Sequence, residues 1–250
     1  MSRAPRSWIQ ICGRLVVEIG GRRVESELPG RKGRVLFVCL VVHRTTDLTG
    51  GELAEQLWPG DQPPGVDATL RTLLSKVRRA VGADVLGRGG GYRLNLGDAH
   101  VDLEAARDAV HRAETAVAAG DWARAWGPSQ VALFTARRGI LAGEDAPWIE
   151  RLRRELAELE LRALECYAAA GLGLGGTELP GAERTARRLV EREPYRESGH
   201  RILMRALAEQ GNVADALRAY DRLATLLRDE LGVDPSPPTR ALHRELLQHT

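Results

Sequence analysis

The stretch from Gly51 to Leu96 constrains the fold more than any other part of this 250-residue chain. Its pattern predicts a short helix ending near Trp58, a loop over 58–66, a longer helix over 67–82 and a hairpin over 85–96. The loop reads WPGDQPPGV, and its three prolines and two glycines exclude a helix there. The helix and the hairpin that follow the loop carry the argument about function.

The helix over 67–82 has one apolar face and one polar face. The apolar side chains that share a stripe, at about 100° per residue, are Leu70, Leu74, Val77 and Val81, with Leu73 beside them. Asp67 stands where an N-cap is expected, and Gly82 stands where the helix should end. The side chains opposite or flanking the stripe are Arg71, Thr72, Ser75, Lys76 and Arg79, with Arg78 nearer the buried edge.

Hydroxyls and cations on one exposed helix face suit contact with nucleic acid. Cations neutralise phosphates, and hydroxyl and guanidinium groups read base edges in the major groove. A solvated charged face is the alternative, and the helix alone does not decide between the two. The hairpin favours DNA, because Arg88 lies among Gly87, Gly89, Gly90 and Gly91, and such a turn can place a cation in the minor groove. Helix and hairpin together predict a winged helix that binds DNA.

Charge is distributed unevenly along the chain. Residues 1–97 contain 15 Lys and Arg against 9 Asp and Glu, whereas residues 98–250 contain 21 against 25. An N-terminal part with excess positive charge and a C-terminal part with excess negative charge predict a DNA-binding domain over 1–97 and a protein-facing domain over 98–250.

The sequence shows no membrane or signal segment. The longest apolar run, Val35–Val42, is far shorter than the roughly 20 residues of a membrane span, and the N-terminus has no apolar signal core. We expect a cytoplasmic protein whose three cysteines, which form no C-x-x-C pair, are buried reduced thiols.

The two predicted domains differ in secondary structure, and the fold class is mainly α. In the first domain, three short strands are expected over 8–12, 15–19 and 22–25, followed by a buried helix over 31–44. From Val101 onwards no convincing strand is seen. The helices expected there are 103–119, 122–136, 147–170, 182–192, 197–210, 213–231 and 238–248.

A weak internal repeat supports paired helices in the second domain. Gly120-Asp121-x-x-x-Ala125 resembles Gly211-Asn212-x-x-x-Ala216, and the spacing of Ala182, Ala186, Leu189 and Pro194 is that of a tetratricopeptide unit. A plain helical bundle also uses alanine and leucine at these spacings. We favour an array of tetratricopeptide-like hairpins, which usually presents a concave surface to a protein or peptide.

No catalytic or cofactor motif is convincing, and we expect a protein that is not an enzyme and takes no metal or cofactor. The sequence Gly171-x-Gly173-x-x-Gly176 has the spacing of a dinucleotide-binding motif, but that motif follows a strand, whereas this segment follows a predicted helix. It is interpreted as a flexible loop. The six histidines lack metal-ligand spacing. Glu144-Asp145 is interpreted as solvated charge. The tryptophans assigned to the helical core are Trp122, Trp126 and Trp148.

Two segments resemble a known family of actinobacterial antibiotic-regulatory activators, the SARP family. The first runs from Gly30-Arg31-Lys32 through Leu53-x-x-x-Leu57-Trp58 and the helix ending at Gly82 to the hairpin, and is similar to an OmpR-type winged helix. The second runs from Arg187 to Pro237, including Glu193-Pro194-Tyr195-Arg196-Glu197, and is similar to that family's bacterial transcriptional activator domain.

The resemblance implies a transcriptional activator of a secondary-metabolite (antibiotic) gene cluster. Such a protein binds double-stranded promoter DNA at tandem direct repeats and recruits the RNA polymerase holoenzyme, including its sigma factor. Two protomers are expected side by side on the DNA. We expect no receiver, ATPase or forkhead-associated domain in this chain, which argues against direct signal sensing.

The resemblance also assigns residues. Those implied to contact DNA are Arg31, Lys32, Arg34, Thr69, Arg71, Thr72, Ser75, Lys76, Arg78, Arg79, Arg88, Tyr92 and Arg93. Those implied to contact RNA polymerase are Trp58, Pro59, Asp61, Gln62, Pro63, Pro64 and Val66. Solubility is the alternative role for the cations near residue 31, and a stiff connector is the alternative role for the loop. A repressor or architectural DNA-binding protein, or a helical-repeat scaffold for protein interaction, remains the alternative function.

Overall fold

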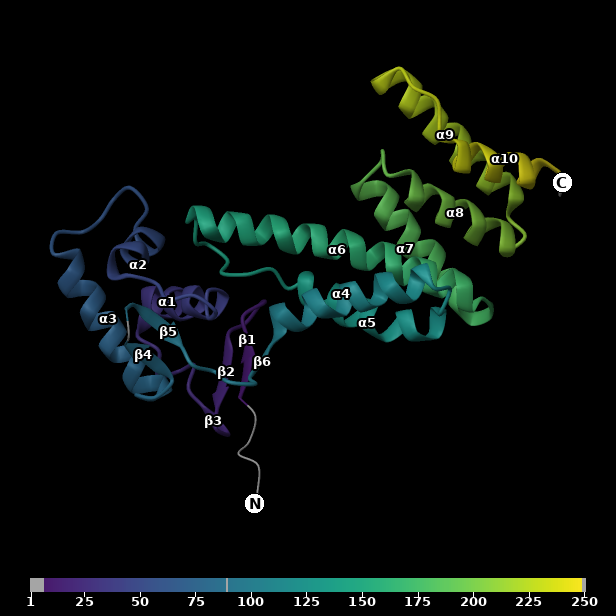
Figure 1. The fold of residues 1–250 in the computed structure, drawn as a ribbon. Coiled ribbons are helices and arrows are strands. Elements are labelled where there is room, and N and C mark those ends of the chain that lie inside the picture. The colour runs from purple at the N-terminus through teal and green to yellow at the C-terminus, as the bar shows by residue number, and fades with distance from the viewer. Residues whose placement is uncertain (1–6, 89, 249–250) are drawn as a thin grey trace. The chain divides into compact units, whose positions relative to one another are not determined.

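The protein is mainly helical. The computed structural model describes residues 7–88 and 90–248, and of Arg88 it describes only the backbone. Within these residues the chain forms ten α-helices and two small sheets, in the order that Figure 1 shows. None of the helices in this described part is long and apolar enough to cross a membrane.

The chain divides into two compact units. The first unit comprises Met1–Ala105 and Thr135–Ala157, and the second comprises Ala106–Phe134 and Glu158–Thr250. The sequence does not indicate that 135–157 groups with the first unit. The predicted domain boundary between residues 97 and 98 therefore stays a prediction.

A four-stranded sheet begins the first unit. Strands β1 (Trp8–Gln10), β2 (Val16–Ile19) and β3 (Arg22–Arg23) are antiparallel neighbours, as the sequence predicted. The sequence missed β6 (His100–Val101), which pairs parallel with β1 and places Ile9 opposite Val101.

Asp102 explains why the chain returns to β1 at this point. Its buried carboxylate accepts hydrogen bonds from the backbone N–H groups of Ile11 at 2.9 Å, Cys12 at 3.1 Å and Leu103 at 2.9 Å. Burial raises the pKa of this carboxyl, and the three N–H donors oppose that rise. One side chain thus joins the end of β1 to the beginning of α4 (Asp102–Ala118).

Three helices and a hairpin complete the winged helix. Helix α1 (Gly30–Val42) is buried along its apolar run, and α2 (Gly50–Leu57) precedes the loop. Helix α3 (Val66–Val81) packs against both, and β4 (Leu86–Arg88) pairs with β5 (Tyr92–Leu94). The four elements lie where the sequence predicted them.

The beginning of α3 differs from the prediction. The N-cap is Gly65, in a left-handed conformation, and Val66 is the first helical residue rather than the last loop residue. Asp67 lies inside the first turn, where its charge favours the helix N-terminus but its side chain caps nothing. A sequence-visible cap does occur at α2, where Thr49 and Glu52 form a capping box.

The remaining helices follow the predicted order. Their bounds are α5 (Trp122–Ala136), α6 (Pro147–Leu174), α7 (Leu179–Arg192), α8 (Glu197–Glu209), α9 (Val213–Leu231) and α10 (Pro237–Gln248). Helix α8 packs against both α7 and α9. Ala182, Ala186 and Leu189 of α7 are buried, so the small and apolar positions of the predicted tetratricopeptide pattern do face the core.

The interpretation of Gly171–Gly176 as a loop is wrong for its first four residues, because α6 continues to Leu174. A Cβ atom at Gly173 would lie 2.3 Å from the indole ring of Trp122, and one at Gly171 would lie 3.2 Å from that of Trp126. These glycines therefore let the two tryptophans pack directly on α6. Trp126 also stacks on Tyr167 with ring centroids 4.4 Å apart.

The cysteines are buried, as predicted. Cys12, Cys39 and Cys166 are buried and form no disulfide within the described residues. Burial raises the pKa of the Cys39 thiol to about 12. The pKa of Cys166 is also raised to about 12, and burial is the largest cause. We infer a structural role for these thiols.

Candidate nucleic-acid interface

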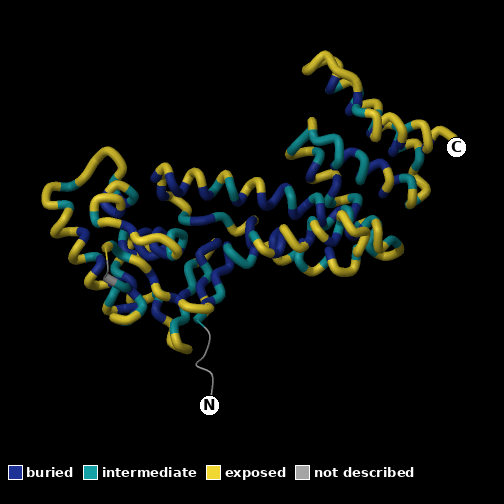
Figure 2. Tube along the Cα trace, in the orientation of Figure 1, coloured by how far each residue is buried: buried dark blue, intermediate teal, exposed yellow. Residues whose placement is uncertain are grey.

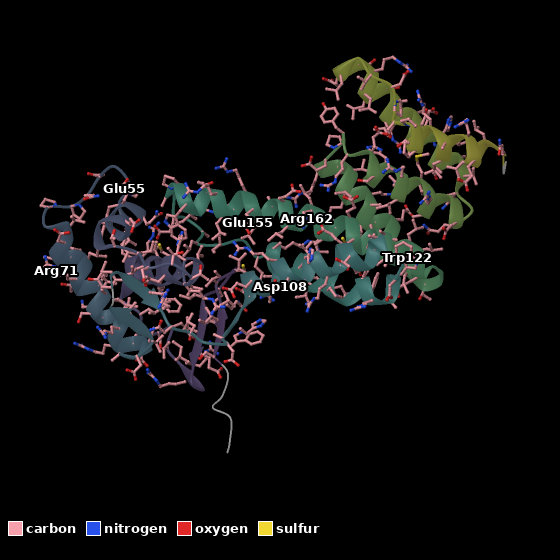
Figure 3. The ribbon with its side chains drawn as sticks, viewed as in Figure 1. Glu55, Arg71, Asp108, Trp122, Glu155 and Arg162 are labelled. Atoms are coloured by element: carbon pink, nitrogen blue, oxygen red, sulfur yellow. The ribbon has the colours of Figure 1, made fainter. Side chains whose placement is uncertain are left out.

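The polar face of α3 is exposed, as the helical periodicity predicts. The buried residues of this helix are Leu70, Leu74, Val77, Ala80 and Val81. The exposed residues among those assigned to DNA are Thr69, Arg71, Thr72, Ser75, Lys76 and Arg79. In Figure 2 exposed residues are yellow and mark the outer side of α3, and Figure 3 labels Arg71 there. The helix is thus held from one side and presents hydroxyls and cations on the other.

Two of the side chains on α3 that are predicted to contact DNA donate hydrogen bonds to nearby backbone carbonyls. The Thr72 hydroxyl donates to the carbonyl of Ala68 at 2.9 Å. Arg78 is half-buried and donates to the carbonyl of Ala83 at 3.2 Å, just beyond the helix end. Arg71, Lys76 and Arg79 make no hydrogen bond or ion pair within the described residues.

A pocket of about 140 Å³ separates α3 from the hairpin. Its lining residues are Arg71, Leu74, Ser75, Arg78, Leu86 and Tyr92. The structure therefore brings four of the predicted site residues together, two cations, one hydroxyl and one aromatic side chain. The lining thus combines the apolar side chains of Leu74 and Leu86 with the cations of Arg71 and Arg78.

The hairpin lies within the predicted range 85–96, and its strands are slightly shorter than that range, at Leu86–Arg88 and Tyr92–Leu94. Its register pairs Leu86 with Leu94, and Arg88 with Tyr92 at the tip. Gly89 and the Arg88 side chain lie outside the described residues, so the minor-groove contact expected of Arg88 stays a prediction. The exposed guanidinium of Arg93 lies 3.5 Å from the carboxylate of Asp47.

The hairpin is attached to the loop before α2 by a residue that the sequence pattern did not indicate. Leu48 forms an isolated antiparallel bridge with Tyr92, at the base of the hairpin tip. A Cβ atom at Gly91 would lie 2.7 Å from the carbonyl oxygen of Leu48, so only glycine allows this approach. Gly91 therefore serves close packing, and no local signal in the sequence marks Leu48 as its partner.

The cations at the beginning of α1 are not equivalent. Arg31 forms an ion pair with Glu144 and donates to the carbonyl of Gly143, and Lys32 donates to the carbonyl of Leu57 at 2.9 Å. Arg34 is exposed and makes no hydrogen bond or ion pair within the part of the chain that the structure describes.

The ion pair also corrects the interpretation of Glu144 as solvated charge. The residue is only 8% exposed. It is buried because segment 135–157 packs with the first unit.

The loop predicted to contact RNA polymerase is non-helical and mostly exposed. Pro59, Asp61, Gln62 and Pro64 are exposed, whereas Trp58 and Pro63 are half-buried. The Gln62 side chain donates to Glu55 of α2 at 3.2 Å. Nearby, the buried indole of Trp148 donates to the carbonyl of Gln56 at 3.0 Å, which anchors the end of α2. Trp148 therefore belongs to the core of the first unit.

Across residues 7–88 and 90–248, no three His, Cys, Asp or Glu side chains come together in a metal-binding group.

Comparison with known proteins points to one family. The family model described as the bacterial transcriptional activator domain matches residues 101–247. The regulatory protein AfsR of Streptomyces coelicolor is 35% identical over 217 residues, which cover 86% of this chain and 22% of AfsR. The transcriptional regulatory protein EmbR of Mycobacterium tuberculosis is 30% identical over 95% of this chain and 62% of its own length.

A solved structure is similar over nearly the whole chain. The structure of Mycobacterium tuberculosis EmbR in complex with a low-affinity phosphopeptide superposes with a TM-score of 0.82 and 28% identity, covering 98% of this chain and 66% of that one. The mainly α fold, with a winged helix and a tetratricopeptide-like helical part, is therefore confirmed. The chain spans about a fifth of AfsR and about three fifths of EmbR.

Proposed function

The chain belongs to the SARP family of transcriptional regulators, and we propose that it binds promoter DNA through α3 and the β4–β5 hairpin and activates transcription. The observation that carries this proposal is the exposed polar face of α3, on which Arg71, Lys76 and Arg79 have no partner within the described residues. Arginines and lysines without an ion pair, on a helix whose opposite face is buried, are suited to bind phosphates and to donate hydrogen bonds to base edges.

In the proposed complex, α3 lies in the major groove. Thr69, Ser75 and Arg79 face base edges or phosphates, and the pocket lined by Arg71, Arg78 and Tyr92 receives the neighbouring backbone. The hairpin tip enters the adjacent minor groove with Arg88. Arg34 is the cation at α1 best placed for a phosphate, because Arg31 and Lys32 already have partners.

Activation is assigned to the loop between α2 and α3. The exposed residues of this loop are Pro59, Asp61, Gln62 and Pro64, and they precede the polar face of α3 in the sequence. They would contact the RNA polymerase holoenzyme and its sigma factor. Two protomers bind tandem direct repeats side by side. The regulated genes are those of a biosynthetic cluster for a secondary metabolite, in keeping with the family.

A gel-shift titration of the full chain on promoters from its own genomic neighbourhood tests DNA recognition. The variant Lys76→Gln/Arg79→Gln should weaken binding by about tenfold or more and lower the salt slope by about one for each phosphate that is no longer neutralised. The matched control is Arg240→Gln/Arg244→Gln on α10, which removes the same charge from exposed positions on another helix. Equal affinity of the two variants would contradict this recognition face.

In vitro transcription separates activation from repression. Asp61→Ala/Gln62→Ala should abolish stimulation of purified polymerase while leaving DNA affinity unchanged. A protein that binds DNA but lowers transcription with or without the intact loop would be a repressor or architectural protein.

A further inference from the structure

The second unit contains a pocket of about 470 Å³ that the proposed DNA and polymerase contacts do not use. Residues of α4, α6 and α8, together with Trp122 at the start of α5, line it. Ligand sites of small molecules commonly have volumes of about 300–1,000 Å³ and combine an apolar wall with a few placed polar groups. The size of this pocket falls in that range.

Four arginines line the pocket, namely Arg162, Arg196, Arg201 and Arg205. Two of them are neutralised by carboxylates of the same lining. Arg162 binds Glu114 through two hydrogen bonds of 2.7 and 2.6 Å, and the Nε atom of Arg196 lies 2.8 Å from Glu165. Arg162 is labelled in Figure 3.

The other two arginines have no carboxylate bound to them within the described residues. Arg201 donates to the hydroxyl of Thr239 at 3.1 Å, and Arg205 has no hydrogen bond or ion pair there. Glu197 is one turn before Arg201, but both of its carboxylate oxygens accept hydrogen bonds from Ser236. Arg201 and Arg205 lie one turn apart on α8, so their guanidinium groups share a face and the lining has an excess of positive charge.

Apolar side chains form much of the rest of the wall, which also includes Cys166 and Ser198. Val117, Trp122, Ala169 and Ile202 contribute to it. The half-buried ring of Trp122 packs on α6 at Gly173, where a Cβ atom would overlap it, so the ring is held in place. The pocket thus offers a fixed aromatic surface and two guanidinium groups that bind no carboxylate directly within the described residues.

We propose that this pocket binds a small carboxylic acid with an aromatic or aliphatic body. The acid group accepts hydrogen bonds from Arg201 and Arg205, whose planar donors match a carboxylate, and the body packs on Trp122 and Ile202. The site goes beyond the proposed DNA binding and does not depend on it.

The test is calorimetric titration of the full chain with naphthalene-2-carboxylate. Saturable binding is expected, with much weaker binding of the neutral naphthalene-2-carboxamide and of acetate, which lacks the body. Arg201→Gln/Arg205→Gln should weaken binding of the acid by about tenfold or more. Arg240→Gln/Arg244→Gln on α10, at the same spacing of four residues, is again the matched control and should leave binding unchanged.

Two further measurements keep the test decisive. Arg205→Gln alone removes no hydrogen bond or ion pair of the described fold, so it should weaken binding without a change in thermal stability even if the double variant is destabilised. In the NMR spectrum, Trp122→Phe identifies the indole N–H resonance of Trp122, and this resonance should shift in the wild-type chain when the acid is added. Absence of saturable binding, or equal weakening in the pocket and control variants, would overturn the proposal, as would equal affinity for acid and amide.

Discussion

Leu48 and Tyr92 exchange two backbone hydrogen bonds, from Leu48 N–H to the Tyr92 carbonyl at 3.0 Å and from Tyr92 N–H to the Leu48 carbonyl at 2.7 Å. The bridge joins the loop before α2 to the second strand of the hairpin. Tyr92 in turn lines the pocket beside α3. The position of the hairpin relative to the proposed recognition helix therefore depends on this contact.

Gly91→Ala should displace the hairpin, because its Cβ atom would lie 2.7 Å from the Leu48 carbonyl oxygen. We expect a decrease of about 1–3 kcal/mol in the free energy of unfolding and weaker DNA binding. The control is Gly51→Ala in α2, where a Cβ atom meets nothing within 4 Å and a gain of about 0.5–1 kcal/mol is expected. Chemical denaturation and gel shift measure both, and unchanged stability of Gly91→Ala would show that the bridge does not constrain the hairpin.

Gly173→Ala should destabilise the second unit. The added Cβ atom would overlap the ring of Trp122, which must then move or force α6 to shift, at a cost of about 1–3 kcal/mol. Gly181→Ala in α7 is the control, since its Cβ atom meets nothing within 4 Å. Denaturation followed by tryptophan fluorescence reports both stability and the environment of the ring. If the two variants were equally stable, the close packing of Trp122 on α6 would be disproved.

Arg31 and Arg34 should behave differently although they are neighbours on α1. Arg31→Gln removes the ion pair with Glu144, and we expect a decrease of about 0.5–1 kcal/mol in stability, discounted because the Arg31 side chain is 68% exposed. Arg34→Gln should leave stability unchanged and weaken DNA binding by about tenfold. Chemical denaturation measures the stability of the two variants, and gel shift measures their DNA affinity. Weaker DNA binding of Arg31→Gln with unchanged stability would contradict this assignment and place Arg31 in the DNA interface.

His200 should make the second unit sensitive to acid. Its Nε2 atom lies 2.9 Å from the Pro194 carbonyl, and its Nδ1 atom has no hydrogen-bond partner in the described part of the chain. Burial is the largest cause that lowers the pKa of this imidazole below its ordinary value of 6.5. The unfolded chain therefore binds a proton near pH 6.5 that the folded chain does not, and stability contributed by neutral His200 is complete above pH 6.5 and falls as the pH drops below it.

His200→Gln should flatten the dependence of stability on pH below 6.5, and the same substitution at exposed His111 should not. Thermal unfolding from about pH 7.5 to about pH 5 measures the slopes on both sides of the histidine titration. Identical slopes in the wild-type chain and His200→Gln would rule out this titration.

The sequence by itself determined most of the helices and which of their faces are buried. Periodicity of about 3.6 residues in 67–82 predicted which side of α3 is buried, since Leu70, Leu74 and Val77 recur on one stripe. Prolines and glycines predicted the loop over 58–66, one residue longer than observed, because they exclude helical backbone. These signals are local, and they are carried by residues that lie close together in the chain.

Only the tertiary structure decided how distant segments complete the site. Asp102 beneath β1, Leu48 against Tyr92, and Glu144 against Arg31 join residues that are far apart in the sequence, and no periodic pattern connects them. The pocket in the second unit likewise arises from four separate helices. Local propensity determines where a helix begins and which face is apolar, whereas the pairing of a charge with its partner depends on which segments pack together in space.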